Sequence, residues 1–599
     1  MNTMIKNRYV KSRNLVTLCL SLLFICIGWL SIEISKFYPL HVPRNSGYLS
    51  QIPTIFWILV FLICFLLPII VFISKSSYLS LFATIGFYVL LNSHNLLFYS
   101  IAGNDIVGLS GWISFMGSFG AHPLSSGFYS YLQWPAYYSY FFTLQKVIAS
   151  ENQIIFEIGY YIIIVSFSIV SWYYFRQLTK KPFKTHVASC FFLILIYPWL
   201  NNQFVPQFIG LVFLIFILGL ERSTICNKKI LILTVYMSLI LSHPILFLFY
   251  LGSKLISIVV TPLTSAFPNQ HRIIDLTTSL REAKNWRISF RPSNILKIDR
   301  ILPIVVLSTI YLYFFMYYFT QFQNRVFFIL IQPVSKSAGN SLSTLRLILF
   351  GSKSSGTVTN IMKYPSLIDN RLSTVLTFGN KVLLALIISL LLYSFLLEKI
   401  EDIPPLDIGV IVSSGFYFIG GMIFNLIGSR SLQILFAPIS FSFALLDREN
   451  IMVIIICILV VSLSPISMLN LIFVNYSLSG GGPVQDYKTN QAGEFANRYS
   501  NEKIVKPVFS IKPALRSSPL QGREDFDARF FIDEGHWNAS LVKTGMLFVH
   551  NSATERFMNS KLIGCKTNMG KTSVIYDNEA QITWLRSQST PCANQTRKF

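Results

Sequence analysis

Residues 54–73 read TIFWILVFLICFLLPIIVFI, a run without a single charged side chain. The hydrocarbon core of a bilayer is about 30 Å thick and is crossed by about 20 residues of α-helix, so this run is long enough to span a membrane. Backbone groups in lipid must find their hydrogen bonds within the segment, which favours a helix. Stretches of similar length with almost no charge occur at 15–34, 154–175, 301–319 and 451–474.

The composition agrees with a membrane protein. Hydrophobic residues make up 53% of the chain and charged residues 13%, whereas soluble domains have roughly a quarter of their residues charged. The formal charge of +23 raises the question of nucleic acid. However, most of the Lys and Arg residues lie in short loops between apolar runs, where they follow the positive-inside rule. We therefore expect no nucleic-acid partner.

The hydropathy pattern predicts an all-α polytopic domain over residues 1–474 and a small soluble α/β or α+β domain over residues 475–599. The tail is too polar to continue the apolar pattern, and runs such as Lys543–Val549 and Thr572–Tyr576 resemble strands. About thirteen spans are predicted, at 15–34, 54–74, 78–101, 153–175, 185–200, 206–220, 229–243, 245–260, 301–320, 381–398, 406–427, 432–446 and 451–474.

The basic connectors orient these spans. Residues 176–184, 222–229 and 272–300 are rich in Lys and Arg and are predicted to face the cytoplasm. They fall on one side only if residues 127–148 (GFYSYLQWPAYYSYFFTLQKVI) do not cross the membrane. This segment is rich in Tyr, carries Trp134 and has a central Pro135, so we predict a horizontal or re-entrant helix at the interface. The N-terminus is then inside and the tail outside the cell membrane.

Asp105 is the only acid in the first long external loop, where it stands between Gly103 and Gly108. A carboxylate beside flexible glycines can take a proton from an attacking group. It can equally hold a divalent cation such as Mg²⁺ or Mn²⁺ through its oxygens. An ordinary solvated loop aspartate is the alternative. We expect no metal cluster elsewhere, because the eight cysteines form no C-x-x-C pair.

Further polar residues are predicted at the external ends of the spans, where such groups often serve a site. Arg430 is suited to bidentate binding of a phosphate, although a snorkelling interfacial arginine fits the pattern equally well. The external loop at 321–380 is also basic, either as a phosphate-binding surface or because long loops translocate regardless of charge. The candidate phosphate ligands are Arg430, Arg325, Arg346 and Arg371, and the candidate substrate-binding residues are Asn104, His122, Gln207 and His243.

Four features of the chain together resemble the type C glycosyltransferase superfamily (GT-C). These are Asn104-Asp105 in the first long external loop, the Tyr/Trp/Pro segment at Tyr131–Tyr140, Pro206-Gln207 opening a span, and Arg430 before a late span. The resemblance implies an integral membrane enzyme that transfers a hexosyl or pentosyl group from a polyprenyl-phosphate sugar to a glycan, lipid or protein acceptor on the extracytoplasmic face. It further implies that Asp105 is the base or metal ligand and that the arginines hold the lipid phosphate.

The chain departs from that family in two respects. It has a single acid where many members have a pair, and its tail lacks a W-W-D type motif. These departures favour a metal-independent enzyme that transfers a monosaccharide. Two alternatives stay open. One is a transporter or flippase of a lipid-linked glycan, which the scarcity of charges within the spans makes less favoured. The other is a non-catalytic envelope protein of GT-C-like architecture.

Overall fold

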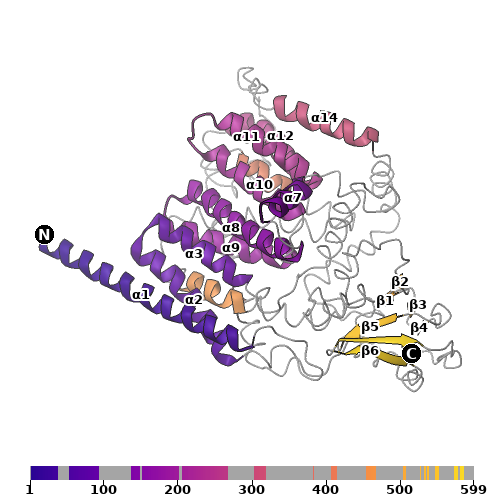
Figure 1. Cartoon of the computed structure of the whole chain (residues 1–599). Helices are drawn as coiled ribbons and strands as arrows, with labels where there is room; N and C mark the ends of the chain where they lie inside the picture. Colours follow the sequence, from indigo (N-terminus) through magenta and orange to yellow (C-terminus); the bar gives the residue numbers. More distant parts are fainter. Residues whose placement is uncertain are drawn as a thin grey trace.

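The structure is a computed structural model, and most of its described part is helical (Figure 1). The described residues are 2–37, 53–92, 136–148, 152–200, 206–266, 302–318, 379, 382–383, 406–414, 454–466 and short strands between 504 and 585. The helices are α1 (Asn2–Phe37), α2 (Thr54–Ser74), α3 (Ser77–Leu91), α7 (Ala136–Ile148), α8 (Asn152–Thr179), α9 (Pro182–Leu200), α10 (Pro206–Arg222), α11 (Lys228–Ser242), α12 (Pro244–Ala266) and α14 (Leu302–Tyr318), with two unlabelled helical segments at 406–414 and 454–466.

Three helices are long and apolar enough to cross a membrane. They are Asn14–Lys36 in α1, Thr54–Ser74 in α2 and Ile158–Thr179 in α8. Ser77–Leu91, Leu246–Ile258, Leu302–Tyr311 and Ile454–Ile466 are shorter apolar helices. The helical, membrane-compatible character predicted from the sequence is thus confirmed, whereas the full set of thirteen spans stays a prediction. The predicted spans at 381–398 and 432–446 lie almost wholly outside the described residues.

Tight turns join three pairs of the described helices, and all three turns lie at one end of this set of helices. We call this end the basic end. The turns are residues 75–76 between α2 and α3, 180–181 between α8 and α9, and 223–227 between α10 and α11. Ser80 Oγ donates to the carbonyl of Pro182 at 2.8 Å and so brings the first two turns together. At the third turn, the Arg222 guanidinium lies 5.4 Å from the centre of the Tyr174 ring, near the end of α8.

Two of the three basic connectors therefore lie at the same end, as the sequence predicted. They are residues 176–184 and 222–229, and the third connector, 272–300, lies outside the described residues. The side of the membrane that this end faces stays a prediction.

Helix α3 runs antiparallel to α8. Tyr160, near the start of α8, donates to Asn92 at the end of α3 with an oxygen–oxygen distance of 2.7 Å. At the other end of the pair, Trp172 Nε1 donates to Ser80 Oγ at 3.0 Å. Hence α3 ends and α8 begins at the same end of the set, opposite the basic end. Residues 93–151 therefore connect two helix ends that lie at the same end of the set.

Helix α7 lies within that connection and packs against α8, α10 and α11. At about 1.5 Å per residue, its 13 residues span roughly 20 Å, which is shorter than a bilayer core. The described part of the segment, 136–148, is thus too short to cross a bilayer by itself, and the prediction that residues 127–148 do not span stays a prediction. Tyr137, Tyr138 and Phe141 are buried.

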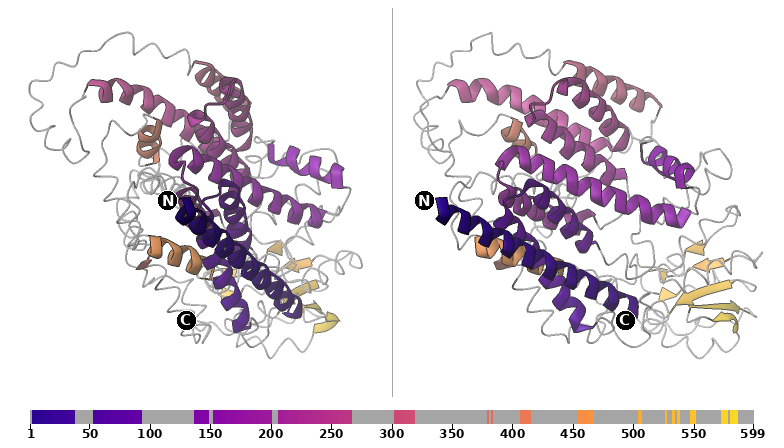
Figure 2. Two further views of the ribbon diagram at one scale, coloured as in Figure 1. Left: turned by 90° about the vertical axis from the view of Figure 1, so that its left-hand side faces the viewer. Right: turned by 60° about the vertical axis from the view of Figure 1, so that its left-hand side comes forward.

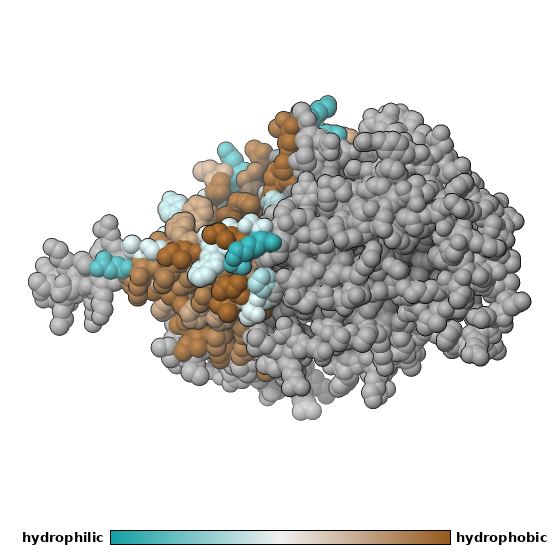
Figure 3. All heavy atoms as spheres, turned by 60° about the horizontal axis from the view of Figure 1, so that its bottom comes forward, coloured by the Kyte–Doolittle hydropathy of each residue, from teal (hydrophilic) through white to brown (hydrophobic). Residues whose placement is uncertain are grey.

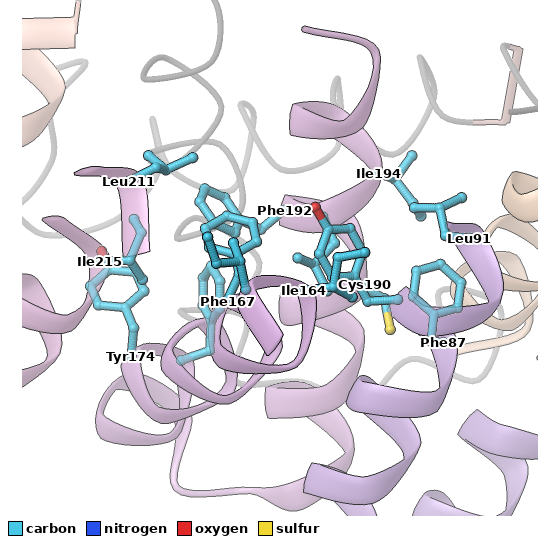
Figure 4. Packing of buried hydrophobic residues seen from close by; sticks show 14 of the residues in the cluster. Phe87, Leu91, Ile164, Phe167, Tyr174, Cys190, Phe192, Ile194, Leu211 and Ile215 are labelled. Carbon is cyan, nitrogen blue, oxygen red and sulfur yellow. The ribbon is translucent and has the colours of Figure 1, made fainter. Parts of the chain in front are cut away.

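Aromatic rings fill the centre of the set. Phe167 of α8 is fully buried and lies among Tyr88 of α3, Phe192 of α9 and Phe208 of α10, with ring-centre distances of 5.7, 5.8 and 5.2 Å. Figure 4 shows Phe167 and Phe192 at this junction. The Phe167 side chain thus links four helices through ring contacts. Aromatic pairs at these distances contribute stabilisation in addition to that from burying their surface.

The outside of the described helices is apolar, as expected of surfaces that face lipid. Figure 3 shows hydrophobic residues covering most of the described face, interrupted by few hydrophilic ones. Helix α1 contributes much of this character, because Leu18, Phe24, Ile25, Trp29 and Ile32 are all more than half exposed. A soluble protein rarely presents so large an apolar surface.

The described part of the tail consists of strands. They are β1 (Ile504–Lys506), β2 (Phe526–Asp527), β3 (Ile532–Asp533), β4 (His536–Trp537), β5 (Leu547–Asn551), β6 (Thr572–Asp577) and β7 (Ala580–Leu585). Five of them form a mixed sheet in the order β2-β1-β5-β7-β6, in which β1 is parallel to both neighbours and β7 is antiparallel to both. In Figures 1 and 2 the sheet lies at the opposite end of the molecule from the N-terminus of α1.

Strands β5 and β6 overlap the two runs that the sequence predicted to be strands. Residues 475–503 of the tail lie outside the described residues. The assignment of the tail to the α/β or α+β class therefore stays a prediction.

Candidate functional site

The end of the helix set opposite the basic end brings together Gln207 and His243, and we call it the Gln207 end. Gln207 lies in the first turn of α10, directly after Pro206, whose fixed φ suits a helix start. His243 ends α11 in an extended conformation and donates its backbone N–H to the Leu239 carbonyl at 3.2 Å. It is only 6% exposed. His243 alone thus connects α11 to α12.

Gly210 allows α10 to approach this turn. A Cβ atom placed on Gly210 would lie 3.1 Å from the Cβ of His243 and 2.9 Å from Cδ1 of Leu246. A residue with a side chain would therefore force α10 away from the turn between α11 and α12. Because Gln207 lies one helical turn before Gly210, this close approach sets the separation between α10 and the backbone that carries His243. The sequence reasoning missed Gly210, although a glycine one turn into a predicted span was the available signal.

Asn92 is at the same end and acts in packing. Its Nδ2 donates to the Tyr88 carbonyl at 2.7 Å, and its Oδ1 accepts the Tyr160 hydroxyl. Asn92 thus makes one hydrogen bond within α3 and one between α3 and α8.

Most of the predicted site residues cannot be located, because their positions lie outside the described residues. These are Asp105, Asn104, His122, Arg325, Arg346, Arg371 and Arg430. Of the predicted set, the structure describes Gln207 and His243, and it brings both to one end. The segment that carries Asp105, Asn104 and His122 leaves α3 at this end and returns to α8 at this end.

A cluster of charged residues at the basic end was not anticipated from the sequence. Glu221 Oε1 accepts from Lys254 Nζ at 2.5 Å and from the Tyr250 hydroxyl at 2.6 Å, which ties α10 to α12. The adjacent Arg222 forms an ion pair with Asp407 of the helical segment 406–414. The Arg222 and Asp407 side chains are 11% and 4% exposed, so this pair is almost completely shielded from water.

Two further contacts complete this cluster, which comprises Glu221, Arg222, Lys228, Tyr250, Lys254 and Asp407. Lys228 Nζ donates to the carbonyls of Glu221 and Ser223 at 3.1 and 2.9 Å and so caps the end of α10. Cations are favoured at this position because the end of a helix carries partial negative charge. The sequence indicated only a basic connector here, since Arg222 and Asp407 are far apart along the chain.

Segment 406–414 approaches α12 closely. A Cβ on Gly409 would collide with the carbonyl oxygen of Ser253, and one on Gly252 would lie 3.6 Å from Ser413 Oγ. Small residues of this kind let membrane helices pack backbone to backbone. The ion pair between Arg222 and Asp407 therefore sits beside a rigid helix contact.

A buried histidine lies farther inside the set. His186 Nδ1 is 3.0 Å from Thr84 Oγ1, and its ring nitrogens are 3.7 and 3.8 Å from Cys190 Sγ. Among the described residues, no group of three His, Cys, Asp or Glu side chains is arranged to hold a metal ion. The described part of the chain thus supplies no complete set of metal ligands.

Comparisons with known proteins leave the family open. No model of a known protein family matches the chain, and no curated protein matches its sequence.

Proposed function

We propose that the chain is an integral membrane glycosyltransferase that transfers a sugar from a polyprenyl-phosphate donor to an acceptor at the Gln207 end. The observation that carries the proposal is the return of residues 93–151 to that end, fixed by the bond between Asn92 and Tyr160. We propose that Asp105, the only acid in the first long predicted loop and part of this connection, acts on the side where Gln207 and His243 lie. The described strands of the tail also lie away from the N-terminus of α1.

The reaction follows from the residue types. The Asp105 carboxylate takes the proton from an acceptor hydroxyl, and the acceptor oxygen attacks the anomeric carbon of the donor. The bond between that carbon and the phosphate oxygen breaks, so polyprenyl phosphate leaves with the electron pair. Arginine guanidinium groups stabilise its negative charge, and the proposed ones are Arg430, Arg325, Arg346 and Arg371.

Gln207 and His243 have different tasks in this scheme. They lie near each other on packed helices, so they suit the positioning of sugar or acceptor hydroxyls by hydrogen bonds. Asn104 and His122 belong to the same connection as Asp105 and are proposed to bind substrate. A divalent cation held by Asp105 is the alternative to its role as a base, and Mg²⁺ or Mn²⁺ would then polarise the donor phosphate.

The test is a transfer assay with the full-length protein in liposomes, supplied with labelled polyprenyl-phosphate sugars. Asp105→Asn removes the base while keeping the shape of the side chain. Asp275→Asn is the matched control, because Asp275 lies in the connector predicted to face the cytoplasm. We expect label to reach acceptor or water with the wild type and with Asp275→Asn, and a loss of at least about 100-fold with Asp105→Asn. Full turnover by Asp105→Asn would overturn the proposed role.

One observation favours a second function. The shielded pair of Arg222 and Asp407 places opposite charges at the end of the apolar helix α10, and paired charges within membrane segments often mark transport pathways. A transporter or flippase of a lipid-linked glycan would move labelled lipid between leaflets without forming a covalent product. The same liposomes distinguish the two functions.

A further inference from the structure

The two lysine-bearing turns at the basic end have an unusual backbone. Lys75 and Lys180 both have a φ of 53°, and Asn227 in the third turn has a φ of 58°. Glycine is favoured in this left-handed region and asparagine is tolerated, whereas lysine gains nothing there from its backbone. The backbone conformation therefore does not explain why lysine occupies these two positions. The charged side chain, which follows the end of α2 and of α8, is the better explanation.

These two turns lie side by side. Ser80 near the start of α3 is bonded to the carbonyl of Pro182 at the start of α9, and the rings of Phe72 and Phe183 are 5.2 Å apart. Lys75 precedes α3 by two residues and Lys180 precedes α9 by two residues. The same contacts therefore bring Lys75 and Lys180 close together.

The resulting surface is exposed and positively charged. Lys75, Lys180 and Lys181 are all exposed, and the Arg176 guanidinium donates to the Lys180 carbonyl and so stays beside the turn. The described acids at the basic end are Glu221 and Asp407, and these are paired with Lys254 and Arg222. Both of these acids are thus engaged by cations other than Lys75 and Lys180.

Aromatic side chains adjoin the lysines. Tyr78, in the first turn of α3, is 78% exposed, and Phe72 and Phe82 are also exposed. Exposed aromatic rings beside cations are typical of the level of lipid headgroups, where the rings sit in the interface. Together, the exposed lysines and aromatic rings have the composition expected of a surface at the level of the lipid headgroups.

We propose that Lys75, Lys180 and Lys181 form a docking surface for the phosphate of an anionic phospholipid at the basic end. General attraction of cytoplasmic loops to anionic lipid would require only charge. Lys75 and Lys180 instead come from two neighbouring turns, so that two cations are available to one headgroup between the helices. This lipid site is separate from the donor site proposed at the Gln207 end and does not depend on the enzymatic activity.

The test measures binding of phosphatidylglycerol to the full-length protein in neutral detergent, with phosphatidylcholine as the reference lipid. The variant Lys75→Gly/Lys180→Gly removes both charges and places glycine where the backbone favours it. Asn227→Gly is the matched control, since it makes the same backbone change in the third turn and removes no charge. We expect affinity for phosphatidylglycerol to fall about fivefold per lysine, and to be unchanged in the control.

A second double variant separates the effect of the lost charge from the effect of the changed backbone preference. Lys75→Gln/Lys180→Gln keeps a long side chain in the left-handed region and should lose the same affinity as the glycine variant. Retention of wild-type phosphatidylglycerol affinity in either double variant would overturn the proposal. Displacement of the lipid by millimolar inorganic phosphate would also overturn it, because the surface would then be a site for free phosphate.

Discussion

Tyr160 donates its hydroxyl proton to Asn92 Oδ1 across 2.7 Å. This bond joins the beginning of α8 to Asn92, the residue that directly follows α3. Both groups are buried. The bond holds the end of α3 beside the start of α8, so residues 93–151 begin and end at the same end of the helix set. The proposed position of Asp105 on this side of the helix set rests on this one contact.

The first prediction concerns the side of that connection. A cysteine at Ser110 and the native, exposed Cys226 of the third turn should be on opposite sides of the membrane. A membrane-impermeant maleimide applied to intact cells should label Ser110→Cys, and Cys226 should react only after permeabilisation. Cys565 and Cys592 are first replaced by serine, because the tail is predicted to be external. Labelling of both positions from the same side would contradict the topology.

The second prediction concerns the stability of the α3–α8 pair. Tyr160→Phe leaves Asn92 Oδ1 without its donor and should lower the free energy of unfolding by about 1 kcal/mol. In the Asn92→Ala background, the same substitution should have almost no effect, since its partner is already absent. Thermal denaturation of the four proteins in detergent measures this coupling, and additive effects of the two substitutions would argue against it.

The third prediction compares two glycines in helices. Gly210→Ala should disturb the turn at His243, because the new methyl group would lie 3.1 Å from the His243 Cβ. We expect a lower melting temperature and, if the proposed function holds, a weaker substrate affinity. Gly86→Ala is the control, since a Cβ there meets nothing within 4 Å, and it should stabilise α3 by roughly 0.5–1 kcal/mol. Equal changes in melting temperature for Gly210→Ala and Gly86→Ala would show that the close approach of α10 to His243 does not cause the loss of stability.

The fourth prediction concerns the buried ion pair. Asp407→Leu leaves the Arg222 charge shielded from water without its partner and should destabilise the protein by about 3–5 kcal/mol. The double variant Arg222→Met/Asp407→Leu should recover most of that loss, because neither charge is then buried. Melting temperatures of the single and double variants are compared in the same detergent. A double variant no more stable than Asp407→Leu would show that the pair acts through other contacts.

Much of the helical pattern was predictable from the sequence, and the difference between helix α9 and its predicted span has a physical cause. The predicted span 54–74 matches α2, because the run is apolar throughout and is bounded by Pro53 and Lys75. Helix α9 begins at Pro182, three residues before the predicted start at 185. The prediction excluded Lys184 as a charged residue, yet Lys184 is buried within the helix. Hydropathy alone cannot detect a charge that the fold accommodates.

The candidate site was less predictable. Gln207 and His243 were indicated by their positions at the ends of apolar runs, and the fold brings them to one end. The cluster around Arg222 was missed, because its pairing with Asp407 depends on how α10 and segment 406–414 meet in space. Periodicity along a sequence carries no information about which helices become neighbours.

The central claim is tested most directly by the rate at which label moves from a polyprenyl-phosphate sugar to an acceptor in liposomes that contain the protein. We predict measurable transfer by the wild type and by Asp275→Asn, and a loss of at least about 100-fold for Asp105→Asn with an unchanged melting temperature. The absence of a transferred product with every donor, or equal rates for the wild type and Asp105→Asn, would contradict the account.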